Sequence, residues 1–188
     1  MKIGILAVQG AFIEHEAILE NLGVSYVEIR KKDDLSAGLD GIILPGGEST
    51  VMGKLLKELD LFDDLRNKIQ DGFPVLATCA GAILLAEEID GEQVSYFGTI
   101  PMKIKRNAYG RQLGSFIAEE NIIGVGNYSM RFIRAPYIMS VAPDVKILSV
   151  VDDKIVAVEY GNQLALAFHP ELTDDYRIHE YFLKKFNP

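Results

Sequence analysis

The stretch of residues 74–87, PVLATCAGAILLAE, combines an apolar strand over 74–78, Cys79 at the turn, and a helix over 80–87. Short apolar runs of this kind are typical of strands buried on both faces of a parallel sheet. A strand that passes at once into a helix predicts a strand–helix–strand unit. We therefore expect an α/β fold.

The same alternation of strand and helix extends through the first half of the chain. Apolar runs predict strands over the following residues: 2–8, 25–30 and 41–44. Helical spacing predicts helices over the following residues: 14–22, 50–59 and 62–70. Such alternation places the strands in parallel and the helices on both faces of the sheet.

The second half of the chain is richer in strands. We expect them over residues 100–105, 114–119, 131–133, 145–151, 154–160 and 163–168. A hairpin turn is expected at Asp152-Asp153, and these strands are expected to extend the sheet in antiparallel fashion. Thr173 is suited to cap a last helix running to about residue 185, with Asp174 and Asp175 at its positive end.

The bulk composition fits a single globular domain over residues 1–188. Hydrophobic residues make up 48% of the chain and charged residues 24%, which gives no sign of disorder. The net charge of -8 argues against nucleic-acid binding and against docking on anionic membranes. A single cysteine permits no internal disulfide, and the first ten residues do not resemble a signal peptide. We therefore expect a cytoplasmic protein.

Cys79 lies where the strand over residues 74–78 meets the following helix. A nucleophile on such a turn projects from the carboxyl edge of the sheet, and the crowded turn requires small neighbours, which Ala77 and Gly81 provide. The helix that begins at Ala80 adds positive potential, which favours a thiolate, and offers the Ala80 N–H as an oxyanion donor. From these residues alone, a buried cysteine with a purely structural role is an equally good interpretation.

A nucleophilic thiol needs a base, and the base needs a group that fixes its tautomer. His169 follows the strand over residues 163–168, and Glu171 is within reach of its imidazole. Cys79 and His169 would then both lie at strand ends on one edge of the sheet, where open α/β sheets place their sites. Taken alone, an unrelated histidine and glutamate are the simpler interpretation.

A glycine-rich turn follows the strand over residues 41–44 and reads PGGEST over residues 45–50. Consecutive glycines let the backbone approach a ligand and aim an N–H at it, so Gly47 is a candidate for a second oxyanion donor. The turn is not a phosphate loop, because that motif needs Ser or Thr after Gly-Lys and Leu55 follows Gly53-Lys54 here. In isolation, a tight turn with a Ser/Thr helix cap is the simpler interpretation.

The remaining polar residues indicate a function less specifically. Four arginines in the second half are suited to bind the carboxylate of an amino-acid substrate, and spacing does not choose among them: Arg106, Arg111, Arg131 and Arg134. Pairs of adjacent aspartates also occur in the chain. They lie in turns or at helix starts with no histidine nearby, so no metal site is expected. His15 and His179 lie on expected helices and are interpreted as solvated surface residues.

Taken together, these residues resemble the class I glutamine amidotransferase family, and within it the glutaminase subunits of pyridoxal 5'-phosphate synthases. The resemblance covers nearly the whole chain. Its most specific segments are residues 6–10 (LAVQG), 44–50 (LPGGEST), 78–81 (TCAG), 132–136 (FIRAP) and 168–173 (FHPELT). Arg106-Asn107 and Gly110-Arg111-Gln112 also match. Several such motifs in order are far more specific than any one of them.

The resemblance implies a three-layer, flavodoxin-like fold with a mixed, mostly parallel sheet and helices on both faces. It implies that Cys79 is the nucleophile, His169 its base, and Glu171 the group that orients the base. The backbone N–H groups of Gly47 and Ala80 would form the oxyanion hole. The glutamine-binding residues that it implies are Gly47, Glu48, Ser49, Arg106, Ile133 and Arg134.

The resemblance also implies hydrolysis of L-glutamine to L-glutamate and ammonia through a cysteine thioester. The ammonia would pass to a separate barrel-fold synthase subunit that builds pyridoxal 5'-phosphate, and the glutaminase itself would bind no cofactor. Ammonia released without a consumer is wasted. We therefore expect the turn at Gly47 to adopt the conformation that completes the oxyanion hole only when the synthase docks. One departure is Ala77, where the wider family pattern has glycine; alanine is small enough to keep the turn.

Three other assignments stay open. A glutaminase that serves another synthase, such as that of histidine biosynthesis, would share the same site. A cysteine peptidase or hydrolase on the same turn would leave the glycine turn and the arginines without a role. A non-catalytic regulatory module would have no need for Cys79, His169 and Glu171 together.

Overall fold

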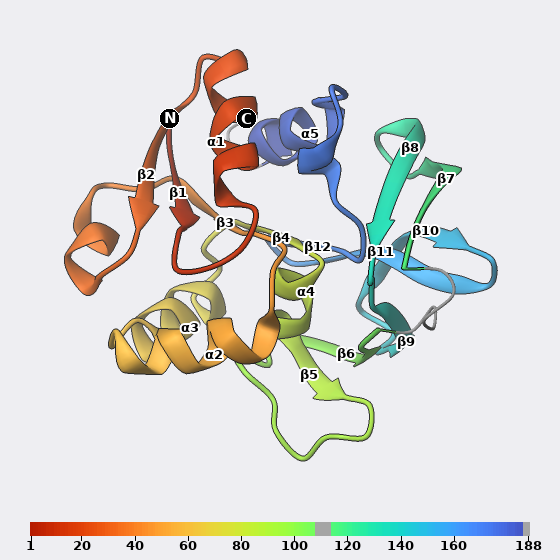
Figure 1. Ribbon diagram of the computed structural model, residues 1–188, viewed down its shortest axis with the longest axis horizontal. Helices are drawn as coiled ribbons and strands as arrows, with labels where there is room; N and C mark the ends of the chain where they lie inside the picture. Colours follow the sequence, from red (N-terminus) through yellow and green to blue (C-terminus); the bar gives the residue numbers. More distant parts are fainter. Residues whose placement is uncertain (108–113, 186–188) are drawn as a thin grey trace.

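A computed structural model describes residues 1–107 and 114–185 of the chain, and within them the main sheet has ten strands (Figure 1). Its parallel half has the order β2-β1-β3-β4-β12. These strands are β1 (Lys2–Leu6), β2 (Ser25–Ile29), β3 (Gly41–Leu44), β4 (Val75–Thr78) and β12 (Gln163–Leu166). The strand–helix alternation of the first half therefore predicted β1 to β4 correctly. Strand β12 comes from the second half, where antiparallel strands were expected, and it pairs in parallel with β4 because it returns to the centre of the sheet.

The sheet continues past β12 in the order β11-β9-β6-β5, and β10 pairs with β11. These strands are β5 (Ala86–Ile89), β6 (Ile100–Lys105), β9 (Tyr137–Val141), β10 (Lys146–Val151) and β11 (Lys154–Tyr160). All of these pairings are antiparallel except that of β5 with β6. The expected hairpin turn is confirmed, because Asp152 and Asp153 join β10 to β11 with φ angles of 47° and 60°.

Helices cover both faces of the sheet, which confirms the three-layer architecture (Figure 1). One face carries α2 (Ser49–Glu58), α3 (Phe62–Gln70) and α4 (Ala80–Leu85). The other face carries α1 (Phe12–Asn21) and α5 (Arg177–Lys185). Because side chains alternate along a strand, Leu44 packs into the first core and its neighbour Ile43 into the second. The described residues also form two short 3-10 turns, η1 (Lys32–Ser36) and η2 (Pro170–Leu172).

One hairpin departs from the expected extension of the sheet. Strands β7 (Ser115–Ile122) and β8 (Gly126–Ile133) form a separate two-stranded sheet. The side chains of Tyr128, Met130 and Phe132 on β8 are buried in the same core as α5. The hairpin therefore covers the main sheet instead of extending it, because its apolar face is buried against that core.

The ends of two helices also differ from expectation. Helix α4 ends at Leu85 because residues 86–89 form β5, and the Leu85 carbonyl accepts the Thr99 N–H at 2.9 Å. Helix α5 begins at Arg177, not near Thr173, because the Asp175 carboxylate accepts the Arg177 N–H at 3.2 Å. Within residues 1–107 and 114–185, every helix is too short or too polar to cross a bilayer.

Candidate active site

The carboxyl ends of β1, β3, β4 and β12 meet at one edge of the sheet, and the loops that follow them enclose a cavity of about 790 Å³. Each loop contributes residues that the sequence singled out. The cavity is lined by Gln9, Gly10, Ala11, Glu14, Gly46, Gly47, Glu48, Cys79, Asn107, Gly114, Ile133, Arg134, His169 and Leu172. The parallel sheet therefore brings these distant segments to one place, as open α/β sheets do.

Cys79 occupies the sharp turn between β4 and α4. Its φ of 46° and ψ of −101° lie in a region that residues other than glycine rarely adopt. The turn is held by its N–H, which donates to the Leu166 carbonyl at 2.8 Å. A side chain at Gly81 would put its Cβ 2.1 Å from the Leu44 carbonyl oxygen, so that position requires glycine. Ala77 is fully buried on β4, which shows that alanine fits where the wider family pattern has glycine.

His169 lies just beyond β12 and immediately before η2. Its backbone N–H donates to the Arg131 carbonyl at 2.8 Å, which ties it to β8. Its Nδ1 lies 2.7 Å from Glu171 Oε1, so an Nδ1–H donor would leave Nε2 free for the cavity. Glu171 is buried, with a fully covered side chain. Because a buried carboxylate needs partners, this pairing fixes the imidazole in one orientation.

The electrostatics of this pair suit acid–base work. Burial alone lowers the pKa of His169, but hydrogen bonds to Cys79 and Glu171, together with their charges, raise it to about 10. The imidazole is therefore protonated near neutral pH. A cationic imidazole beside a thiol stabilises the thiolate, which is the nucleophilic form of cysteine.

The glycine turn after β3 lies against both His169 and the loop after β1. A side chain at Gly46 would put its Cβ 2.3 Å from His169 Cε1, so the ring lies directly on the Gly46 backbone. The Gln9 Oε1 accepts the Glu48 N–H at 2.7 Å, and the Ala11 N–H donates to the Gly46 carbonyl at 2.9 Å. Gln9, which has no assigned role from the sequence, therefore holds this turn in position.

The other implied glutamine-binding residues fall into two groups. Glu48, Ile133 and Arg134 line the cavity together with Gly47. Ser49 and Arg106 do not line it: Ser49 is buried at the start of α2, and Arg106 is turned aside.

Arg106 is held close to the glycine turn but outside the cavity. Its guanidinium donates to the Thr50 hydroxyl at 2.8 Å and to the Tyr96 hydroxyl at 3.0 Å, and it pairs with Glu92. Of the competing arginines, Arg131 is exposed on β8, and Arg111 lies outside the described residues. Within the described part of the chain, no group of three or more His, Cys, Asp or Glu side chains is arranged to hold a metal ion.

The interpretation of His15 and His179 as surface residues is wrong. Both side chains are fully buried, and their rings contact each other at a centroid distance of 5.1 Å. The sequence held a signal for this, because His15 shares helical spacing with Ile18 and Leu19, which are buried on the same helix. His179 has the same spacing relative to Phe182 on α5.

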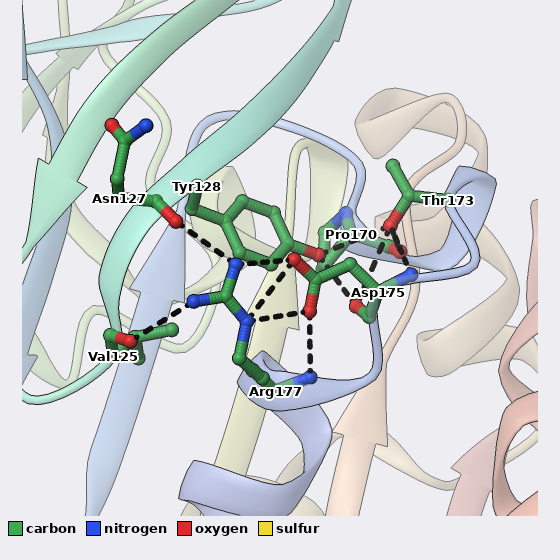
Figure 2. Close-up of polar contacts among 7 residues, drawn as sticks. All are labelled: Val125, Asn127, Tyr128, Pro170, Thr173, Asp175 and Arg177. Carbon is green, nitrogen blue, oxygen red and sulfur yellow. Dashed lines mark hydrogen bonds and ion pairs between the residues drawn. The ribbon is translucent and has the colours of Figure 1, made fainter.

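The segment that carries Glu171 is anchored on both sides (Figure 2). The Tyr128 hydroxyl lies 3.1 Å from Thr173 Oγ1 and donates to the Asp175 carbonyl at 2.8 Å. The Thr173 hydroxyl donates to the Pro170 carbonyl at 3.0 Å, and the Arg177 guanidinium pairs with the Asp175 carboxylate. These contacts fix η2 between β8 and α5, and with it the side chain that orients His169.

Comparison with known proteins assigns this chain to a family. A sequence profile of the SNO glutamine amidotransferase family matches residues 5–188. The chain belongs to that family. Its members are glutamine amidotransferases, and the chain is therefore an enzyme that hydrolyses glutamine.

Two curated relatives cover nearly the whole chain. The pyridoxal 5'-phosphate synthase subunit PdxT of Desulfitobacterium hafniense is 60% identical over 183 residues, which is 97% of this chain and 92% of the relative. The subunit of the same name from Streptococcus pneumoniae is 54% identical over 187 residues, which is 98% and 96% of the two chains. The family resemblance that the sequence motifs indicated is therefore confirmed.

Solved structures confirm the fold. A crystal structure of a glutamine amidotransferase superposes with a TM-score of 0.94 at 42% identity, covering 99% of both chains. A putative GMP synthase component from Thermoplasma acidophilum superposes with a TM-score of 0.70 at 21% identity, covering 99% of this chain and 94% of the other. The second comparison concerns the fold alone.

Proposed function

We propose that the chain is the glutaminase subunit of a pyridoxal 5'-phosphate synthase and releases ammonia from L-glutamine for a synthase partner. The observation that carries the proposal is Cys79 on its strained turn, beside the His169–Glu171 pair and on the wall of one cavity. The curated relatives that carry the name of this subunit support the choice of synthase.

The proposed reaction consists of two acyl transfers. The Cys79 thiolate attacks the side-chain amide carbon of glutamine. The oxyanion that forms accepts hydrogen bonds from the backbone N–H groups of Gly47 and Ala80. The His169 imidazolium gives its proton to the leaving nitrogen, so ammonia departs and a glutamyl thioester remains. Neutral His169 then takes a proton from water, which attacks the thioester and releases glutamate and the Cys79 thiolate. Glu171 keeps the imidazole in the orientation that both steps need.

The cavity wall supplies the contacts proposed for the rest of the substrate. Glu48 and Arg134 carry charges suited to the amino and carboxylate groups of glutamine, and Ile133 gives an apolar contact. Ser49 and Arg106 complete the implied set, but Arg106 has to leave Glu92 before it can contact a ligand in this cavity. The chain itself carries no proposed cofactor.

The proposed partner is a barrel-fold synthase subunit in a hetero-oligomeric complex in the cytoplasm, which consumes the ammonia. Gly47 and Glu48 are exposed, so a docked partner is able to reach the turn that holds one oxyanion donor. We expect the docked partner to place this turn in the conformation that completes the oxyanion hole. Ammonia release would then depend on the presence of the subunit that consumes the ammonia.

This proposal is tested by measuring glutamate release by the isolated chain, then with the pyridoxal 5'-phosphate synthase partner, and then with a synthase of histidine biosynthesis as the control. An oxyanion donor is worth about 10²-fold in turnover, so the cognate synthase should raise the rate by about that factor. Equal rates with and without the partner would contradict the partner dependence. Activation by the control synthase alone would contradict the choice of pathway.

A further inference from the structure

Two of the three histidines of the chain face the buried Glu171 carboxylate, and the third contacts one of these two. His169 contacts Glu171 from the cavity side, and His15 approaches the same carboxylate from α1 with its Nε2 at 3.6 Å from Oε2. His179 on α5 follows behind, with its Nε2 at 2.9 Å from His15 Nδ1. The reaction described above uses only the first of these histidines, so the other two need their own explanation.

Thr78 links the same groups from β4. Its hydroxyl donates to Glu171 Oε1 at 3.4 Å, and its oxygen lies 3.4 Å from His15 Nε2. Because the single hydroxyl hydrogen is used on Glu171, the Thr78 oxygen is left to accept a hydrogen from His15. Both Thr78 and Glu171 Oε2 therefore require that His15 carries its proton on Nε2.

The proton positions follow from this requirement. With His15 protonated on Nε2, its Nδ1 is an acceptor, and His179 must donate from its own Nε2. In this cluster two buried atoms have no hydrogen-bond partner in residues 1–107 and 114–185: His179 Nδ1, a bare acceptor, and Glu171 Oε2, which His15 Nε2 faces at 3.6 Å. The reverse arrangement would leave a buried N–H unpaired at His179 Nδ1 and turn a lone pair of His15 toward the Glu171 carboxylate. The first arrangement is the lower in energy.

Both inner histidines are neutral, as this arrangement requires. Burial, together with the nearby His179 and His169, holds the pKa of His15 well below its usual value. Burial lowers the pKa of His179 to about 4. Near neutral pH the two imidazoles therefore act as aligned N–H donors and not as charges.

We propose that His15 and His179 are positioning residues: His179 orients His15, and His15 directs its Nε2–H at Thr78 Oγ1 and at the facing Glu171 carboxylate, which holds in place the group that orients His169. The proposal rests on the proposed glutaminase function, because the positioned group is its general acid and base. Neither side chain lines the cavity, so His15 acts through Thr78 and Glu171, and His179 acts through His15. Misplacing a catalytic group by a fraction of its hydrogen-bond length lowers the rate of chemistry while leaving substrate binding intact.

The proton positions are tested directly on the wild-type chain by nitrogen-15 NMR of the three imidazoles, which needs no activity. We expect His15 and His179 to be neutral near pH ~7 with the proton on Nε2, since a buried neutral imidazole keeps one fixed tautomer. A proton on Nδ1 of either ring, or a charged His15, would overturn the proposal.

The positioning role is tested with matched variants assayed together with the synthase. In His15→Gln the amide keeps an N–H donor close to the place of Nε2, whereas His15→Met has a similar size and no donor. We expect His15→Met to lower kcat by about 10- to 100-fold with little change in KM for glutamine, and His15→Gln to recover most of that loss. His179→Met and His179→Gln should follow the same order with smaller effects, because His179 acts through His15.

The outcomes separate this proposal from the function on which it rests. A wild-type kcat in folded His15→Met, or equal losses in the Met and Gln variants, would overturn the positioning role while leaving the glutaminase assignment intact. A wild-type chain that releases no glutamate with its synthase, yet shows the expected tautomers, would count against the proposed function instead. Thermal unfolding of each variant establishes that it is folded.

Discussion

Single residues in this site must fit the space around them as well as supply the right chemistry. Cys79 and His169 come from turns after different strands, and each is signalled locally by its place at a strand end. The sequence does not show that His169 lies against Gly46, because that contact exists only once β3, β4 and β12 are paired. The residue types could be predicted, whereas their mutual distances could not.

Gly46 gives a prediction at this scale. In Gly46→Ala the new methyl group would lie 2.3 Å from His169 Cε1, so the imidazole must move. We expect kcat to fall by about 100-fold, because a displacement of roughly 1 Å at a reacting group costs that much. Glutamate release with the synthase present measures it.

The matched control is Gly161→Ala in the turn between β11 and β12. It has a φ of 53°, so alanine strains the backbone, but the added Cβ meets no described atom within 4 Å. The control should lose about 1 kcal/mol of stability and keep its kcat. Equal loss of kcat in both variants would contradict the steric explanation.

Elements of secondary structure explain why the two inner histidines, His15 and His179, are buried although their polarity favours the surface. Helices α1 and α5 lie together on one face of the sheet (Figure 1). Each turns a histidine toward the other, with His15 Nδ1 2.9 Å from His179 Nε2. The helical spacing of His15 with Ile18 and Leu19 indicated a buried face, but polarity pointed to the surface. The buried His15 imidazole finds its hydrogen-bond partners on β4 and on the facing helix, and both partners are distant in the sequence.

His179 makes stability depend on pH in a defined window. Its pKa is about 4 in the folded chain and about 6.5 when unfolded, so the unfolded state binds more protons between these values. Stability contributed by neutral His179 is therefore present above pH ~6.5 and is lost as the pH falls toward ~4.

Urea unfolding at pH ~7 and pH ~5 measures this effect. We expect the wild-type chain to lose about 2 kcal/mol more between these conditions than His179→Gln, which cannot be protonated. Identical losses in the two proteins would contradict a neutral, buried His179.

Thr173 gives a second prediction for an element, the η2 turn. Its hydroxyl contacts Pro170 and Tyr128, and it accepts the Asp175 N–H at 3.3 Å (Figure 2). Thr173→Val removes these contacts at nearly constant volume and should cost about 1–2 kcal/mol of unfolding free energy. Thr173→Ser keeps the hydroxyl and should retain most of the stability in the same urea titration. A Val variant as stable as the Ser variant would show that the network does not anchor η2.

At the scale of the whole molecule, the parallel sheet is what turns separate motifs into one site. The alternation of strand and helix predicted this sheet, its two covered faces and the edge on which the motifs gather. It did not predict that β8 leaves the sheet or that residues 86–89 form β5, because both depend on pairings and packing between distant segments. Local pattern fixes the parallel strands β1 to β4, while tertiary contacts decide how the strands of the second half pair.

The central claim is that this assembled edge hydrolyses glutamine through Cys79. Glutamate release by Cys79→Ala in complex with the synthase tests it most directly, with circular dichroism to establish that the variant is folded. Removal of the nucleophile should lower turnover by at least about a thousandfold relative to the wild-type complex. A folded Cys79→Ala complex that releases glutamate at the wild-type rate would contradict the claim.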